Sequence, residues 1–117
     1  MNYQIGIDVV DNYKFLSLSS LAVKRMLTEN EYKEYLLIDD SYKPKYLAGR
    51  WAAKEAVYKS LHNIVRINVV NIEILYNENR IPYCSNVNDI SISISHTDNH
   101  TVAISIFKLI NKNCIKN

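Results

Sequence analysis

Apolar and polar residues alternate in four stretches of the chain, a pattern typical of strands that bury one face. In the first stretch one face holds Tyr3, Ile5, Ile7 and Val9, and the other holds Gln4, Gly6 and Asp8. The remaining stretches cover residues 69–76, 90–95 and 102–106. An N-E-N-R turn leads from the second stretch into a short strand with Pro82, and H-T-D-N-H joins the third to the fourth. The sequence therefore predicts an N-terminal strand, with Asp8 near its end, and two hairpins.

Helical patterns fill the region between the first strand and the first hairpin. We predict a first helix over residues 11–26 and a second that runs towards Leu37 from Thr28, where T-E-N-E forms a capping box with Glu31. The third and longest begins at Pro44, because proline is favoured in a first turn, and ends near Leu61. These elements predict an α+β fold in which an antiparallel sheet packs against a long central helix.

The long helix has charged residues on faces that are otherwise apolar. On a helical wheel Arg50 and Lys54 point into an apolar sector, and Glu55 and Lys59 lie beside a row of alanines. Buried charges are costly unless they are paired. Two accounts are open: Glu55 and Lys59 form an i,i+4 pair while Arg50 and Lys54 extend to the surface, or the helix binds a polyanion together with a metal ion.

Other polar residues allow both a plain and a functional interpretation. Asp8 is ordinary at a strand end, yet Asp8 and Glu55 could share one Mg²⁺ if the fold brings them together. His96, in S-H-T, is first of all a turn histidine, and His62 and His100 are expected on the surface.

Composition limits the class of protein. A chain of 117 residues, 48% of them hydrophobic, fits one domain, expected over residues 1–110 with a polar tail over 111–117. Cys84 and Cys114 lack disulfide or zinc spacing, and no apolar run approaches the roughly 18 residues of a membrane span. We therefore expect a cytoplasmic protein with no membrane partner. A net charge of +2 does not imply nucleic-acid binding, but positive charge is concentrated around the long helix.

Three motifs follow one another along the chain: G-I-D-V-V at residues 6–10, L-A-G-R-W-A-A-K-E-A-V-Y-K at 47–59 and S-I-S-H-T at 93–97. Together they resemble the holo-[acyl-carrier-protein] synthases, the short bacterial branch of the 4′-phosphopantetheinyl transferases, over residues 5–107. The resemblance implies that family's fold and Mg²⁺-dependent transfer of phosphopantetheine from coenzyme A to a serine of apo acyl carrier protein. Adenosine 3′,5′-bisphosphate is the other implied product, and the implied pathway is fatty-acid and lipid synthesis.

The resemblance also implies roles for individual residues. Asp8 and Glu55 match the Mg²⁺ ligands, and Lys59 matches the lysine that contacts the diphosphate, so these three form the implied catalytic set. The implied coenzyme A contacts are Arg50, Lys59, Asn79, Pro82, His96 and Thr97. The implied carrier-protein contacts are Lys14, Lys24 and Arg25. The base that takes the serine proton stays open between Glu55 and a metal-bound water, and Glu31 is explained by capping. Members of the family are homotrimers with the coenzyme site between subunits.

The chain departs from the family pattern at two turns. L-H-N-I-V-R follows the long helix where a glycine-rich turn is usual, and Asn79-Arg80-Ile81-Pro82 stands in place of N-G-K-P. We expect Asn79 to take the left-handed conformation there. Two other functions remain open: a nucleic-acid module that stacks bases on Trp51 and Tyr58, which Glu55 disfavours, and a catalytically idle coenzyme A-binding or structural trimer.

Overall fold

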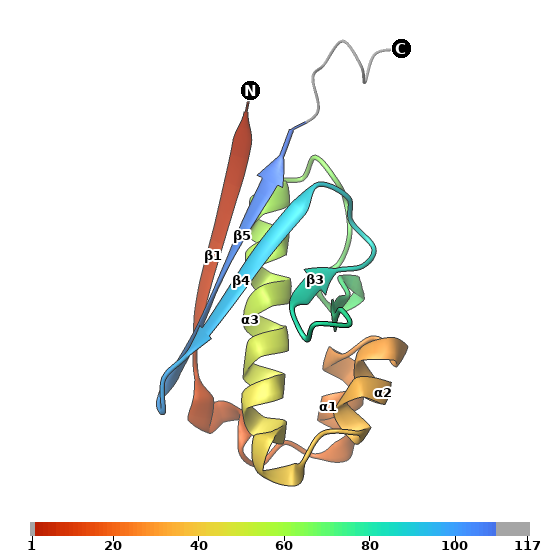
Figure 1. Ribbon diagram of the computed structural model, residues 1–117, viewed down its shortest axis with the longest axis vertical. Coiled ribbons are helices and arrows are strands. Elements are labelled where there is room, and N and C mark those ends of the chain that lie inside the picture. The colour runs from red at the N-terminus through yellow and green to blue at the C-terminus, as the bar shows by residue number, and fades with distance from the viewer. Residues whose placement is uncertain (1, 110–117) are drawn as a thin grey trace.

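The computed structural model describes residues 2–109 and places an antiparallel sheet against a long helix (Figure 1). The strands are β1 (Tyr3–Asp11), β2 (Ile74–Tyr76), β3 (Pro82–Cys84), β4 (Ile90–His96) and β5 (His100–Lys108). The helices are α1 (Ser20–Met26), α2 (Glu29–Leu36) and α3 (Lys43–Leu61), with 3₁₀ turns at Asn12–Phe15, Asp40–Tyr42 and Val69–Asn71. The predicted α+β fold class is confirmed. No helix within this range is long and apolar enough to cross a membrane.

β5 is the middle strand of a three-stranded antiparallel sheet with the order β1-β5-β4. β1 pairs with β5 along its whole length, from Tyr3 opposite Lys108 to Asp11 opposite His100. The first and last strands of the described chain are therefore neighbours, and β1 forms an edge of the sheet. β2 and β3 make a separate two-stranded sheet that contacts β4 (Figure 1).

Small residues let α3 lie directly on the sheet. A Cβ atom on Gly6 would be 1.9 Å from the carbonyl oxygen of Ala56, so only glycine fits at this crossing. Three alanines of α3 face the strands and are fully buried: Ala52, Ala53 and Ala56. The core continues through Val57, Leu61, Ile72, Ile74, Ala103 and Phe107.

The first strand buries its polar face against α3 rather than its apolar one. The inner face of β1 holds Gln4, Gly6 and Asp8. Gly6 allows the close approach of α3, Gln4 Nε2 donates to the carbonyl oxygen of Ser60 at 2.9 Å, and Asp8 accepts from Lys59 of α3. The apolar residues point away from α3, and Ile7 and Val9 are 57% and 62% exposed. We call this apolar surface the outer face; it comprises Tyr3, Ile5, Ile7 and Val9 of β1 with Ile104 and Ile106 of β5, which pair with Ile7 and Ile5.

Local signals predicted several elements correctly. Thr28 and Glu31 form the expected capping box of α2, and α3 has its proline in the first turn. The hairpin of β4 and β5 is also confirmed. The helix predicted over residues 11–26 is wrong in its first half: β1 extends to Asp11, a 3₁₀ turn follows, and α1 begins only after the Ser19 cap.

The strand predicted over residues 69–76 is also too long. Its first part is a 3₁₀ turn, and only Ile74–Tyr76 are extended. The backbone N–H groups of Ile74 and Tyr76 donate to carboxylates of α2 instead of to another strand, at 2.8 Å from Glu31 Oε2 and 2.8 Å from Glu34 Oε2. The predicted polar tail, with Cys114, lies outside the described residues.

Candidate active site

One cluster of charges lies where β1 crosses α3. Lys59 Nζ is 3.1 Å from Asp8 Oδ1 and also donates to the carbonyl oxygen of Ile7 at 3.0 Å. Burial and the neighbouring charge of Asp8 raise the pKa of Glu55, and the cation of Lys59 opposes this shift. The fold therefore brings together the three residues predicted to be catalytic. We call them the carboxylate cluster: Asp8, Glu55 and Lys59.

This arrangement corrects the pairing expected along the helix. The ion pair of Lys59 is made with Asp8 of the strand rather than with Glu55, its i−4 neighbour. Within residues 2–109 no group of three or more His, Cys, Asp or Glu side chains could hold a metal ion. A cation at this site would therefore have two carboxylates from the chain and would take its remaining ligands from water or a substrate.

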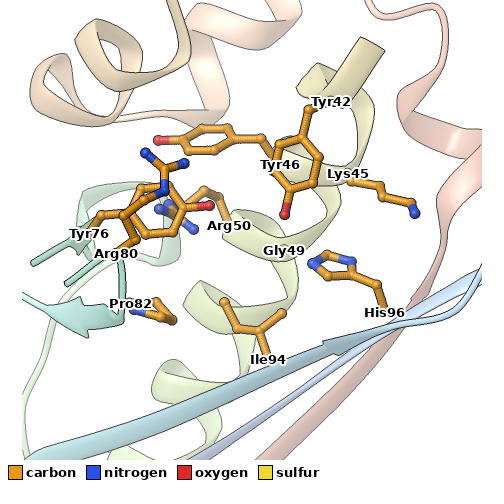
Figure 2. A pocket seen from close by; sticks show the side chains of 10 residues that line it. All are labelled: Tyr42, Lys45, Tyr46, Gly49, Arg50, Tyr76, Arg80, Pro82, Ile94 and His96. Atoms are coloured by element: carbon orange, nitrogen blue, oxygen red, sulfur yellow. The ribbon is translucent and has the colours of Figure 1, made fainter. Parts of the chain in front are cut away.

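A cavity of about 280 Å³ lies on the other flank of α3, between this helix, β4 and the β2–β3 sheet (Figure 2). Its lining is cationic and aromatic, and it comprises Tyr42, Lys45, Tyr46, Gly49, Arg50, Tyr76, Arg80, Pro82, Ile94 and His96. Figure 2 shows Arg50, Arg80 and Tyr76 gathered at one end and His96 with Lys45 at the other. We call this space the cationic cavity. Its two positively charged ends are suited to a ligand with more than one phosphate.

Arg50 is held rigidly in the wall of the cationic cavity. Its side chain is 2% exposed, its Nη2 atom lies 3.3 Å from Glu34 Oε1, and its guanidinium lies 4.3 Å from the ring centre of Tyr46 and 4.4 Å from that of Tyr76. Its Nε atom is buried without a hydrogen-bond partner in the described chain. The account in which Arg50 extends to the surface is therefore wrong, and its Nε donor is left unsatisfied within the described chain.

Lys54 is a structural residue. It is fully buried, and its three N–H donors meet Glu31 Oε1 at 2.6 Å, the Met26 carbonyl at 2.8 Å and the Val70 carbonyl at 3.0 Å. Lys54 therefore does not reach the surface as expected, and it has no donor left for a phosphate. Glu31 pairs with it in addition to capping α2.

The remaining predicted coenzyme A contacts divide between the cationic cavity and its surroundings. Pro82 and His96 line the cavity. Thr97 and Asn79 are not among its lining residues: Thr97 Oγ1 accepts from the N–H of His100 at 2.9 Å in the β4–β5 turn, and the Asn79 N–H donates to Asn77 Oδ1 at 2.8 Å. The left-handed residue of the β2–β3 turn is Arg80, with a φ of 60°, and not Asn79 as expected.

Sequence reasoning missed several residues that line the cavity. Tyr46 and Gly49 lie about one turn apart on the face of α3 that carries Arg50, and Tyr42 lies one turn earlier, at the residue that precedes the helix. Gly49 leaves room for the ring of His96, because a Cβ there would be 3.3 Å from His96 Cε1. That helical stripe was a signal available in the sequence. The contributions of Tyr76 and Arg80 had none, since they depend on how the β2–β3 sheet docks.

The carboxylate cluster and the cationic cavity do not face each other within one chain. Asp8 of β1 and Ile94 of β4 both pair with Ala103 of β5, so the whole width of β5 separates them. Two strand spacings amount to about 10 Å, and α3 fills the space above the sheet (Figure 1). The residues predicted for one reaction therefore lie on two separate flanks of the protomer.

The predicted carrier-protein contacts lie before α2. Lys14 is in the 3₁₀ turn that follows β1, and Lys24 and Arg25 are in the last turn of α1. All three are exposed, and the Lys24 ammonium lies 5.4 Å from the ring centre of Tyr32. Their role in binding a partner stays a prediction.

Comparison with known proteins gives consistent matches. Residues 4–107 match the 4′-phosphopantetheinyl transferase superfamily. The chain is 34% identical over 108 residues to the holo-[acyl-carrier-protein] synthase of Mycoplasma capricolum subsp. capricolum, covering 92% of this chain and 96% of that protein. It is 36% identical over 106 residues to the synthase of Mycoplasma genitalium, covering 87% and 92%. A crystal structure of a holo-(acyl-carrier-protein) synthase from Bacillus anthracis in complex with CoA (3′,5′-ADP) is similar with a TM-score of 0.77 and 27% identity, covering 88% of this chain and 93% of that one.

Proposed function

Because the chain belongs to the 4′-phosphopantetheinyl transferase superfamily, we propose that it is a holo-[acyl-carrier-protein] synthase. It transfers the 4′-phosphopantetheine group of coenzyme A to a serine of apo acyl carrier protein and releases adenosine 3′,5′-bisphosphate. The observation that carries this proposal is the match over residues 4–107 together with a cationic cavity on α3. The reaction takes place in the cytoplasm and supplies holo carrier protein for fatty-acid and lipid synthesis.

The cationic cavity is the proposed nucleotide site. Cations at both of its ends suit the separate phosphates of coenzyme A, and the tyrosine rings between them suit a base or ribose. Arg50 supports this assignment because its guanidinium lies in the cavity wall beside Tyr76 and Arg80. Pro82, His96 and Arg80 complete the proposed contacts, with Asn79 and Thr97 at the edges of the site.

The carboxylate cluster fits a magnesium ion. Mg²⁺ is commonly held by one or two carboxylates together with water and substrate phosphates. Burial and then the charge of Asp8 raise the pKa of Glu55, and a cation would neutralise these two neighbouring carboxylates. Asp8 and Glu55 would hold the ion. When bound, it would neutralise negative charge on the diphosphate.

The chain's own groups account for positioning and proton transfer. The serine oxygen attacks the phosphorus that carries the pantetheine arm, and the bond from that phosphorus to the oxygen of the adenosine bisphosphate breaks. Lys59 contacts the diphosphate and stabilises the negative charge that moves onto the leaving oxygen. Glu55 is the chain's own candidate for accepting the serine proton, because its carboxylate lies in the carboxylate cluster beside Asp8 and Lys59.

Assembly as a homotrimer would bring the two flanks of α3 together. Asp8, Glu55 and Lys59 of one subunit would face the cationic cavity of the next, so each complete site would lie between two chains. The outer face supports this proposal, because it exposes branched apolar side chains on neighbouring strands. Lys14, Lys24 and Arg25 are the proposed contacts for an acidic carrier protein.

Mass spectrometry of an apo acyl carrier protein incubated with the chain, coenzyme A and Mg²⁺ tests the proposal. We expect the mass of the carrier protein to increase by one phosphopantetheine group, and chelation of Mg²⁺ to stop the reaction. Asp8→Ala and Glu55→Ala should abolish transfer while the protein stays folded, and Glu29→Ala, on an exposed carboxylate, is the matched control. Transfer at the wild-type rate by Asp8→Ala at saturating Mg²⁺ would refute the assignment of the metal ligands.

The alternative is a catalytically idle coenzyme A-binding or structural trimer. It would use the same cavity and the same outer face, so only turnover separates it from the enzyme. A wild-type protein that binds coenzyme A but leaves the carrier protein unmodified would favour this alternative.

A further inference from the structure

A buried series of hydrogen-bonded side chains connects the start of the Asn12–Phe15 turn to the cationic cavity. Asn12 is 7% exposed and Thr101, on β5, is fully buried. Asn12 Nδ2 donates to the carbonyl oxygens of Thr97 and Asp98, at 2.9 and 3.1 Å. Thr101 Oγ1 lies 2.7 Å from Asn12 Oδ1 and also 2.7 Å from His96 Nδ1.

The donor and acceptor chemistry of these groups determines where every proton in this series of hydrogen bonds lies. Backbone carbonyls only accept hydrogen bonds, so the NH₂ group of Asn12 must face them and its Oδ1 must face Thr101. Because Oδ1 also only accepts, the single hydroxyl proton of Thr101 is donated to it. Thr101 Oγ1 can then only accept from the imidazole, and His96 must carry a proton on Nδ1.

The other ring nitrogen of His96 is therefore the one available to a ligand. The ring lies against Gly49 of α3, where an added Cβ would be 3.5 Å from Nε2. Figure 2 shows the ring extending from β4 towards the middle of the cavity. In the neutral ring Nε2 is an acceptor, and in the imidazolium it is a donor. The Nδ1–H bond to Thr101 is the same in both states, so the ring gains or loses a proton at Nε2 without moving.

From this geometry we infer that Asn12 and Thr101 are positioning residues that hold His96 in its Nδ1–H tautomer and direct Nε2 at a phosphate group of the bound nucleotide. The inference rests on the proposed function, since it takes the nucleotide to occupy the cationic cavity. Neither Asn12 nor Thr101 touches the ligand, and both act through the imidazole ring. Asn12 and Thr101 would fix the orientation of the ring before binding, and Nε2 would donate to the phosphate once it takes up a proton.

The experiment is ¹⁵N NMR of the histidine side chains combined with titration of adenosine 3′,5′-bisphosphate. The His96 signal is assigned by its loss in His96→Asn. We expect the Nδ1–H tautomer in the free wild-type protein at a pH where the ring is neutral. Thr101→Val should lose this single tautomer and weaken nucleotide binding by roughly tenfold, the effect of one hydrogen bond to a charged group.

Two variants are controls for this effect. Thr101→Ser keeps the hydroxyl and should keep both the tautomer and the affinity. Ser105→Ala removes another buried hydroxyl of β5, which bonds to Ser60 Oγ at 2.9 Å and not to the histidine, and should change neither. If Thr101→Val does not fold, the tautomer in the wild-type protein still tests the inference.

An Nε2–H tautomer in a wild-type protein that binds the nucleotide would overturn the positioning role and leave the proposed function intact. Wild-type tautomer and affinity in folded Thr101→Val would also overturn it. A wild-type protein with no affinity for adenosine 3′,5′-bisphosphate would instead refute the proposed function, and with it the assignment of Nε2 to a phosphate.

Discussion

At the scale of single residues, the neighbours of a charge decide whether it is available for chemistry. Lys54 and Lys59 are five positions apart on α3, yet Lys54 has all three donors satisfied inside the protein while Lys59 is about half exposed beside Asp8. Only Lys59 can exchange its present partner for a substrate. Positions on the helical wheel do not show this difference, because it depends on the partners that other elements bring to each lysine.

Lys59→Ala should separate function from stability. The pair with Asp8 is partly exposed, so its loss should cost no more than about 1 kcal/mol of the free energy of unfolding. The same change removes a contact to the diphosphate and should slow transfer roughly 100-fold. Lys59→Arg should recover only part of the rate, because the planar guanidinium of arginine replaces the compact ammonium group of lysine. Thermal unfolding and initial transfer rates on the same samples check this, with Lys33→Ala as control. An Ala variant as fast as the wild type would make Lys59 an ordinary surface lysine.

Nucleotide binding should also depend on pH through His96. Burial and the charges of Lys45 and Arg50 lower the pKa of His96, so the free ring is neutral at pH 7, and Arg80 in the same cavity adds positive charge. A bound phosphate favours the imidazolium and raises this pKa again. Between the two pKa values binding takes up a proton, so affinity increases as the pH falls and levels off below the pKa of the free protein.

Calorimetry in buffers of different ionisation enthalpy measures this proton uptake. We expect more uptake by the wild-type protein than by His96→Asn, which retains any contribution from the phosphate itself. Equal uptake by the two proteins would show that His96 does not gain a proton on binding.

At the scale of elements, α2, α3 and β2 are joined by two parallel sets of polar contacts. Glu31 accepts from Lys54 and from the N–H of Ile74. Glu34 accepts from Arg50 and from the N–H of Tyr76. Two carboxylates one helical turn apart thus bind two cations of α3 and the backbone N–H groups of Ile74 and Tyr76 in β2. This explains why β2 needs no further strand and how one wall of the cationic cavity is held in place.

Lys54→Met should destabilise the protein by about 3–5 kcal/mol, because it leaves the fully buried carboxylate of Glu31 without its cation. Lys33→Met breaks the exposed pair with Glu29 and should cost less than about 1 kcal/mol. Urea unfolding of both variants measures the difference. The double variant Lys54→Met/Glu31→Gln should recover part of the loss, and equal effects of the two single changes would contradict a buried ion pair.

The elements also show which parts of the protein a sequence can predict. The capping box at Thr28 and the proline in the first turn of α3 are local signals, and both predicted their helices correctly. The buried face of β1 could not be predicted, because alternation reveals that two faces differ but not which one meets the helix. The partners of Arg50 and Lys54 come from α2 and β2, and no spacing along the chain specifies that docking.

For the candidate site, motifs predicted the carboxylate cluster and part of the cationic cavity. Asp8, Glu55 and Lys59 do lie together, and Arg50, Pro82 and His96 line the cavity.

The left-handed conformation in the turn before Pro82 was predicted for the wrong residue: Arg80, and not Asn79, has the positive φ. Side-chain preference favours asparagine in that conformation, but the carboxamide of Asn77 accepts from the N–H groups of Asn79 and Ile81 and so determines the local geometry.

At the scale of the whole molecule, the outer face and the separation of the two flanks both favour assembly. We expect the wild-type protein to scatter light as a trimer of 13.6 kDa chains. Ile7→Glu should dissociate it and abolish transfer without unfolding the protomer, because the Ile7 side chain is 57% exposed in a single chain. Leu37→Glu, at an 89% exposed position away from this face, is the control. A fully active monomer of the wild-type protein would contradict the proposed trimer.

The pairing of β1 with β5 also determines when the protein can fold during its synthesis. Asp11 pairs with His100 and Tyr3 with Lys108, so β1 has no partner until almost the whole described chain has been made. Until then the backbone of β1 and its apolar side chains stay open to chaperones and to strands of other chains. We expect nascent chains that end after β4 to be digested rapidly by added protease, and protection to begin only when β5 has emerged.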